Sequence, residues 1–202
     1  MKDNWLTKRW ARYVARKSKV GITIDFMFLV LVILLAIPQT RHAITNVIIR
    51  NTLFQPRESN AVVYITDADA QWQLQAPNGD TITLKQLHGK VLFVNFWATW
   101  CPPCVAEMPS IQQLYDRWGK DVVFLLINDE ESEKVNTFLT DKGLTLPVYR
   151  ALSPIPAMLD SESIPATFII TRQGRLALQK VGAADWNGRK VNQLIEKYVL
   201  EK

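Results

Sequence analysis

The sequence predicts an α/β fold, a central mixed sheet flanked by helices, preceded by one transmembrane helix. Two almost wholly apolar runs, residues 91–96 and 122–128, are typical of strands that are covered on both faces. Apolar residues recur at helical spacing over 103–118, 131–142 and 191–200. Strands and helices therefore follow one another along the chain, as they do in an α/β sandwich.

Two hairpins are expected to complete the sheet. Asn78-Gly79 favours a tight turn with positive φ angles, and Gln173-Gly174 separates a second pair of extended runs. An apolar patch at 62–65 is expected to add an edge strand. The strands of the two hairpins are expected at 72–74 and 81–84, and at 168–170 and 176–181.

The net charge of +5 is unevenly distributed. Up to Arg57 there are ten Lys and Arg residues against two Asp, a net charge of +8, so the rest of the chain carries −3. The basicity belongs to the N-terminal segment, and the remaining residues have no basic surplus. This distribution excludes nucleic acid as the expected partner.

The N-terminal segment has the pattern of an uncleaved membrane anchor. Residues 20–37 are mostly apolar, and a helix of that length spans roughly 27 Å. Residues 37–40 offer no small-x-small cleavage site, which favours an anchor over a signal peptide. More positive charge precedes the span than follows it, so the N-terminus should stay cytoplasmic and the rest should be exported to the periplasmic side of the cell membrane. Asp25 is expected to reach the inner headgroups, with a functional intramembrane carboxylate as the alternative.

The predicted organisation has four parts. These are a basic cytoplasmic tail at 1–19, the anchor at 20–38, a juxtamembrane linker or interfacial helix at 39–60, and a globular domain at 61–202.

Cys101 and Cys104 are the only cysteines, and they lie where a predicted strand gives way to a helix. A zinc site normally has four ligands, and the only histidines, His42 and His88, are distant in sequence. A structural disulfide across so short a loop removes little unfolded-chain entropy. Val105 stands where haem attachment needs a histidine. These alternatives are weaker than thiol–disulfide exchange.

The position of the pair predicts the role of each sulfur. Cys101 falls at the N-terminus of the predicted helix, where free N–H groups and the helix dipole favour a thiolate, so it is the expected nucleophile. Cys104 lies one turn further in and is the expected resolving thiol. Pro102 and Pro103 offer neither an N–H nor a charge to the Cys101 thiolate. A strong oxidant needs a greatly stabilised thiolate, so this pair predicts a reductant.

Residues 91–109, VLFVNFWATWCPPCVAEMP, resemble the active-site segment of thioredoxin-like proteins, in particular the membrane-anchored, extracytoplasmic TlpA/ResA branch. Residues 163–170, SIPATFII, resemble the cis-proline loop and following strand of that fold, and the similarity covers about 69–202. The resemblance implies a thioredoxin-like fold and a protein thiol-disulfide oxidoreductase that needs no cofactor or metal. Its partners would be a disulfide-containing protein substrate and a membrane thiol electron donor.

The resolving step needs a base, and the resemblance directs attention to Glu107. Ordinary thioredoxins have a buried aspartate where this chain has Asn95, which cannot exchange a proton at neutral pH. Glu107 follows Cys104 by three residues, so it shares its helical face, and the TlpA/ResA branch has a glutamate there. The alternative is a solvated surface glutamate.

The resemblance also implies a substrate-binding surface. A cis Ile164–Pro165 bond would expose the Ile164 backbone to pair with an extended substrate segment. Trp100 and Pro102, on either side of the nucleophile, would complete the contact surface.

Three functions stay open at this point. The favoured one is an anchored disulfide reductase, for which cytochrome c maturation is one candidate role. The second is an oxidase or isomerase that uses the same residues. The third is a copper(I)-handling protein, for which Met108 and Met158 are the available extra ligands.

Overall fold

The structure, a computed structural model, describes residues 19–36 and 62–201, which fall in two units, Met1–Thr45 and Asn46–Lys202. In the first unit it describes one helix, α2 (Lys19–Ala36), on which large apolar side chains such as Met27 are exposed. Across both described ranges, no helix combines the length and apolar character needed to cross a membrane, so the predicted transmembrane span is not confirmed. The predicted tail up to residue 18 and the linker at 39–60 lie outside the described residues.

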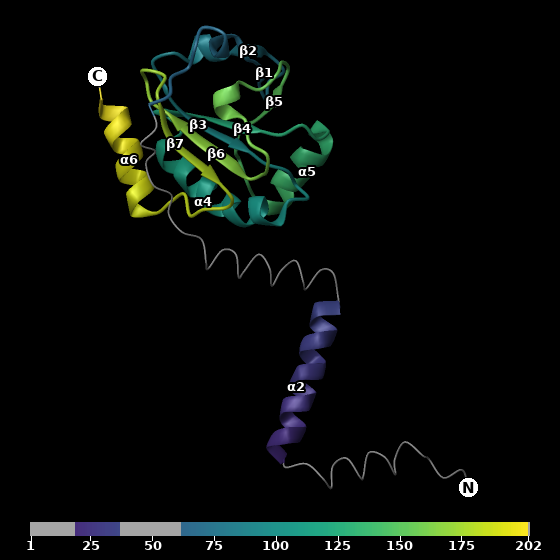
Figure 1. The fold of residues 1–202 in the computed structure, drawn as a ribbon. Helices are drawn as coiled ribbons and strands as arrows, with labels where there is room; N and C mark the ends of the chain where they lie inside the picture. The colour runs from purple at the N-terminus through teal and green to yellow at the C-terminus, as the bar shows by residue number, and fades with distance from the viewer. Residues whose placement is uncertain (1–18, 37–61, 202) are drawn as a thin grey trace, which may run out of the picture. The chain divides into compact units, whose positions relative to one another are not determined.

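The second unit contains a seven-stranded sheet with the order β2-β1-β5-β4-β3-β6-β7 (Figure 1). Strand β3 pairs in parallel with β4 and antiparallel with β6, so the sheet is mixed, as predicted. The strands are β1 (Gln73–Gln75), β2 (Thr81–Thr83), β3 (Val91–Phe96), β4 (Val122–Ile127), β5 (Val148–Ala151), β6 (Ala166–Ile170) and β7 (Leu176–Val181).

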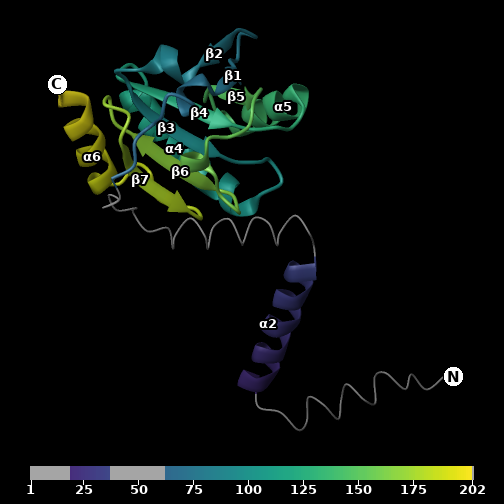
Figure 2. The same cartoon turned by 45° about the horizontal axis from the view of Figure 1, so that its top comes forward.

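Within residues 62–201, three α-helices accompany the sheet, namely α4 (Pro102–Trp118), α5 (Ser132–Lys142) and α6 (Arg189–Leu200). Figures 1 and 2 both show α6 beside β7 and α5 near β4 and β5. Gly143 ends α5 in the left-handed conformation, with φ of 63°, which a residue without a Cβ adopts at low cost. Short 3-10 helices occur at η1 (Asp69–Gln71), η2 (Leu84–Leu87) and η3 (Ala157–Leu159).

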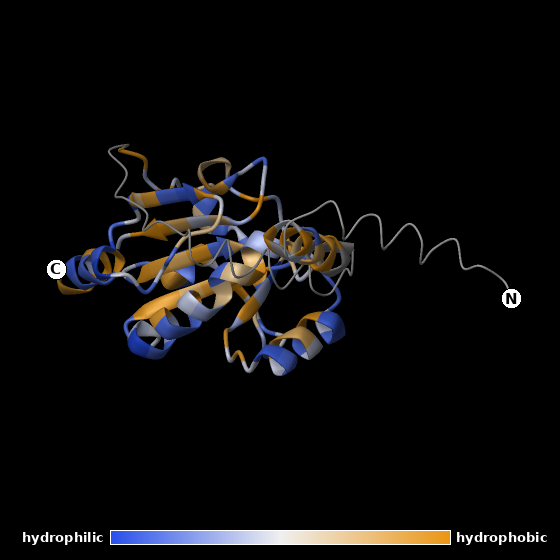
Figure 3. Ribbon diagram, turned by 90° about the horizontal axis from the view of Figure 1, so that it is seen from below, coloured by the Kyte–Doolittle hydropathy of each residue, from blue (hydrophilic) through white to orange (hydrophobic). Residues whose placement is uncertain are grey.

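The core lies on both faces of β3, because successive side chains of a strand point to opposite faces. Val91 and Phe93 belong to the cluster that includes the buried faces of α4, α5 and α6. Leu92 and Val94 belong to a second cluster, together with Leu159 of η3. Figure 3 shows the central strands mostly in the colour of hydrophobic residues. Apart from Asn95, β3 is composed of apolar residues, and this composition follows from its burial on both sides.

The structure differs from the sequence-based prediction at two strands. Strand β5 was not predicted, because its side chains are half-buried except for the exposed Arg150, and they show no period-2 pattern. The expected edge strand at 62–65 is instead an isolated bridge between Tyr64 and Arg175. Its neighbours Val63 and Ile65 form backbone hydrogen bonds with the turn that leads into β7.

Candidate active site

The cysteine pair lies where the central strand β3 passes through a short loop into α4. Cys101 is the N-cap of α4, and Cys104 lies in its first turn. The two sulfurs form a disulfide with a Cα–Cα distance of 5.3 Å. Cys101 is 4% exposed and Cys104 is 0% exposed, so the first sulfur is the one nearer to solvent.

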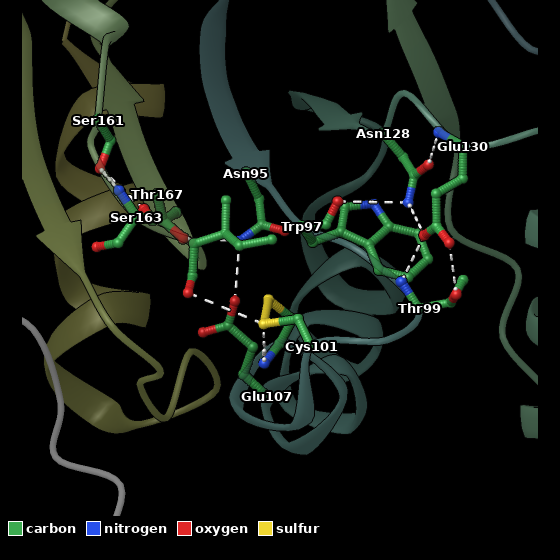
Figure 4. The surroundings of a disulfide bond; sticks show 12 residues. Asn95, Trp97, Thr99, Cys101, Glu107, Asn128, Glu130, Ser161, Ser163 and Thr167 are labelled. Carbon is green, nitrogen blue, oxygen red and sulfur yellow. Dashed lines mark hydrogen bonds between the residues drawn. A yellow bond between two sulfur atoms is a disulfide. The ribbon is translucent and has the colours of Figure 1, made fainter.

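The Cys101 sulfur has a sparse set of polar neighbours. The backbone N–H of Cys104 donates to it at 3.3 Å, and the carbonyl oxygen of Ile164 lies 3.8 Å from it (Figure 4). Pro102 and Pro103 lie between the cysteines and have no N–H, so the Cys104 N–H is the first helical donor that this sulfur can meet.

The loop before β6 lies against the nucleophile because β3 and β6 are neighbours. Phe96, at the end of β3, pairs with Ala166, at the start of β6. The preceding Ile164–Pro165 peptide bond is cis. Pro165 is buried and Ile164 is half-buried. The Ile164 carbonyl therefore lies beside the Cys101 sulfur.

The other two expected substrate contacts flank the same sulfur. Trp100 is 68% exposed, which is unusual for so large an apolar side chain, and Pro102 is half-buried. Trp100, Pro102 and Ile164 thus give the cysteine pair partly exposed apolar neighbours, whereas Pro165 is buried.

Glu107 is a buried residue and not a solvated surface glutamate, since its exposed fraction is 0%. Its Oε1 accepts a hydrogen bond from Asn95 Nδ2 at 2.9 Å. Its Oε2 accepts one from the Ala184 backbone N–H at 3.1 Å and one from Trp186 Nε1 at 2.8 Å. Asn95 Nδ2 also donates to Thr167 Oγ1 at 2.8 Å. The carboxylate is thus held by three donors from outside its own helix.

This environment makes Glu107 able to exchange a proton near neutral pH. Burial raises its pKa from 4.5 to about 7, against the opposing effect of the hydrogen bonds from Trp186, Asn95 and Ala184 and of the positive charge of Lys180. A general base works best when its pKa lies near the working pH. Because Glu107 follows Cys104 by three residues on one helical face, it is suitably placed to serve that thiol.

A second carboxylate supports the loop that precedes Cys101. Glu130 accepts hydrogen bonds from the Thr99 backbone N–H at 2.6 Å and from its hydroxyl at 2.8 Å. Asn128 donates to Glu130 at 3.1 Å and to the Trp97 carbonyl at 3.3 Å, and Lys134 forms a salt bridge with Glu130. Burial alone would raise the pKa of Glu130, but these hydrogen bonds outweigh it and lower the pKa to about 2.

Sequence reasoning missed both sets of supporting residues. Glu130 comes three residues after the end of β4, and that position was the available signal, because the carboxyl ends of neighbouring parallel strands meet at one edge of a sheet. Trp186 gave no such signal, because it lies 79 residues from Glu107 in the chain.

The two methionines proposed as copper ligands lie on opposite faces of the sheet. Met108 packs in the cluster of α4, whereas Met158 packs against the second cluster. They cannot both reach the cysteine pair. Within the parts of the chain that the structure describes, no group of three or more His, Cys, Asp or Glu side chains is arranged to hold a metal ion.

The sequence and fold match known proteins. A family model described as Redoxin matches residues 69–195. Thiol-disulfide oxidoreductase ResA of Bacillus thuringiensis (strain Al Hakam) is 33% identical over 120 residues, covering 54% of this chain and 68% of that protein. ResA of Bacillus subtilis (strain 168) is 33% identical over 133 residues, covering 63% of this chain and 72% of that protein.

Solved structures agree on the fold. A crystal structure described as a thiol:disulfide interchange protein DsbE from Chlorobium tepidum has a TM-score of 0.54, with 21% sequence identity. The match covers 73% of this chain and 99% of that chain. At this identity the similarity supports the thioredoxin-like α/β architecture and nothing finer.

Proposed function

The chain belongs to the Redoxin family, and from this premise we propose that it reduces protein disulfides at the outer face of a membrane. It is a thioredoxin-like protein thiol-disulfide oxidoreductase of the TlpA/ResA branch. The direction of exchange, the substrate and the location are the proposed parts.

The proposed cycle begins with the Cys101 thiolate attacking a substrate disulfide. The substrate S–S bond breaks, one substrate thiolate leaves, and a mixed disulfide forms on Cys101. Glu107 then takes the proton of the Cys104 thiol, and the resulting thiolate attacks the Cys101 sulfur. The second substrate thiolate leaves and is protonated, so the substrate gains two electrons and the protein ends with the Cys101–Cys104 disulfide seen in the structure.

The observation that supports the reductase direction is that few hydrogen-bond donors reach the Cys101 sulfur among the described residues. Two prolines separate the cysteines, and the Cys104 N–H is the hydrogen bond that the structure gives the Cys101 sulfur. Strong oxidases owe their potential to a greatly stabilised thiolate. The buried Glu107 on the same helix adds negative charge when ionised, which disfavours a thiolate further.

The redox potential of the protein, equilibrated against dithiothreitol and glutathione buffers, tests this direction. We expect a value near that of thioredoxin, roughly −270 mV. A value near that of DsbA, roughly −120 mV, would identify an oxidase and overturn the proposal.

For the location, we propose export of the second unit and anchoring through the N-terminal segment. The support is the charge of +8 up to Arg57 and the exposed apolar side chains of α2. Resistance to carbonate extraction, together with labelling of the reduced cysteines by a membrane-impermeant maleimide in intact cells, is the expected result. Reaction with the maleimide only after cell lysis would contradict export.

A protein in an oxidising compartment needs a source of electrons, so we propose a membrane thiol donor as the second partner. Apocytochrome c, with its Cys-x-x-Cys-His motif, is the substrate that the resemblance to the TlpA/ResA branch supports. The protein should reduce an oxidised apocytochrome peptide faster than it reduces an unrelated peptide disulfide. Equal rates would contradict apocytochrome c as the preferred substrate.

A further inference from the structure

The loop between β7 and α6 is tied to Glu107 by two donors. The Ala184 backbone N–H and the Trp186 indole N–H both reach Oε2, at 3.1 and 2.8 Å. The third donor, Asn95, comes from β3 and reaches the other oxygen. The proposed catalytic cycle does not use Trp186.

Trp186 is held firmly in place by other contacts. It is 0% exposed, and its ring packs edge-on against Phe93 with the centroids 5.1 Å apart. Its backbone N–H donates to Ser110 Oγ at 3.1 Å, and that hydroxyl donates to the Glu107 carbonyl oxygen at 2.8 Å. Its side chain and its backbone are therefore both connected to α4, next to the carboxylate.

The chemistry of the indole makes its contact with Glu107 favour one protonation state of the carboxyl group. An indole N–H can donate and cannot accept, so it suits an ionised carboxylate and gives nothing to the proton of a carboxylic acid. Asn95 differs, because it has both an amide donor and an oxygen, and within the described part of the chain that oxygen has no hydrogen-bond partner. Asn95 is able to serve both protonation states of Glu107, whereas Trp186 favours one.

Few other charges act at this position. Lys180 on β7 contributes a positive charge, and the cysteines of α4 are the nearest titratable groups along the helix. Asp185 lies in the same loop as Trp186, where its carboxylate accepts the Asn187 backbone N–H at 3.2 Å. The indole is therefore a principal local influence on the carboxylate.

We propose that Trp186 is a positioning residue, whose indole N–H holds the Glu107 carboxylate in the orientation and charge state in which it takes the Cys104 proton. This inference rests on the proposed role of Glu107 in the resolving step. It makes the β7–α6 loop a part of the reaction machinery, although the loop follows the cysteines by about 80 residues in the chain.

The test is the Trp186→Phe variant, which keeps an aromatic ring against Phe93 and removes the N–H. The reduced full-length protein is mixed with excess 5,5′-dithiobis(2-nitrobenzoate), and the second release of thionitrobenzoate reports the attack of Cys104 on Cys101. The rate of this step is followed from pH 5 to 9. Trp72→Phe is the matched control, because Trp72 is 2% exposed and its indole N–H donates elsewhere, to the Ser153 carbonyl at 3.3 Å.

Loss of the donor should raise the pKa of Glu107 and move the rising limb of the profile about one pH unit to the alkaline side. With half of Glu107 ionised at pH 7 before the change and about a tenth after it, resolution slows roughly fivefold at pH 7 and little at pH 9. Trp72→Phe should leave the limb in place. A uniform slowing of the Trp186 variant at every pH would mean that the indole acts through packing alone, and would overturn the inference.

Glu107→Gln separates this inference from the proposed function. If Glu107→Gln keeps the wild-type profile, Glu107 is not the base and both ideas fail. If Glu107→Gln abolishes the rising limb of the pH–rate profile while Trp186→Phe leaves that limb at its wild-type pH, only the inference fails. In the Glu107→Gln background, Trp186→Phe should change the rate less than twofold, and a further fivefold slowing there would contradict the proposed route through Glu107.

A measurement on the wild-type protein covers the case in which the Trp186 variant does not fold. The ¹⁵N–¹H signal of the Trp186 indole should titrate with a midpoint near the pKa of Glu107, about 7, and should stop titrating in Glu107→Gln. An indole signal that is constant between pH 5 and 9 in the wild-type protein would overturn the inference.

Discussion

Replacing Glu107 by Gln should stabilise the oxidised protein at alkaline pH and leave its stability nearly unchanged at acidic pH. The fold raises the pKa of this carboxyl from 4.5 to about 7. Each unit corresponds to about 1.4 kcal/mol, so the ionised carboxylate costs the native state about 3 kcal/mol. Glutamine carries no charge at any pH and avoids that cost.

The direction in which stability changes with pH follows from the number of protons that the native and unfolded states bind. Between pH 4.5 and 7 the unfolded chain has lost the Glu107 proton while the native state still holds it, so native stability falls as the pH rises through this window. Below the window both states are protonated, and above it the full cost is present. The difference between Glu107→Gln and wild type should therefore grow from near zero at pH 4 to about 3 kcal/mol at pH 8.5.

Glutamine should also fit the site. Its carbonyl oxygen can accept from Ala184 and Trp186, as Oε2 of Glu107 does. Its amide then faces Asn95, whose oxygen has no hydrogen-bond partner among residues 62–201 and can turn to accept. Thr167, which accepts from Asn95 in the structure, can donate its hydroxyl instead.

Urea unfolding of the oxidised forms at pH 4, 6 and 8.5 measures this difference. The disulfide removes both thiols from titration, and comparison of the two proteins at one pH cancels the contribution of other groups. A difference that stays constant with pH, or a wild type that becomes the more stable protein as the pH rises, would refute the reasoning.

The remaining predictions concern the loop before Cys101. Glu130→Gln should lose charged hydrogen bonds from Thr99, which should lower the free energy of unfolding by about 1–3 kcal/mol at pH 7. Because the pKa of Glu130 is lowered to about 2, this loss should vanish as the pH falls from 4.5 through 2. The control Glu133→Gln, on the exposed surface of α5, should stay within about 0.5 kcal/mol of wild type in the same urea titrations. Trp100→Ala should leave stability unchanged and lower kcat/KM for a protein disulfide more than for oxidised glutathione, since Trp100 is 68% exposed; equal losses would exclude a role in protein binding.

Local sequence patterns were enough to predict most of the helices and strands of the second unit. The apolar run at 91–96 predicted burial of β3 on both faces, the helical spacing over 131–142 predicted α5, and Asn78-Gly79 predicted the β1–β2 turn, where Gly79 has a φ of 90°. Strand β5 was not predicted, because a short strand of mostly half-buried residues shows no clear hydrophobic period.

The sequence by itself determined the chemistry of the pair. Two cysteines, two intervening prolines and a glutamate one turn further on are close together in the chain, so their relative placement at the start of α4 follows from local geometry.

Only the tertiary structure decided how those groups are supported and tuned. Glu107 accepts a hydrogen bond from Trp186, 79 residues away, and Thr99 donates one to Glu130, 31 residues away. A pKa depends on desolvation and on the donors that surround a group, and both arise when segments distant in the chain pack together. Helical spacing placed Glu107 beside Cys104, but the packed sheet and loops removed it from water.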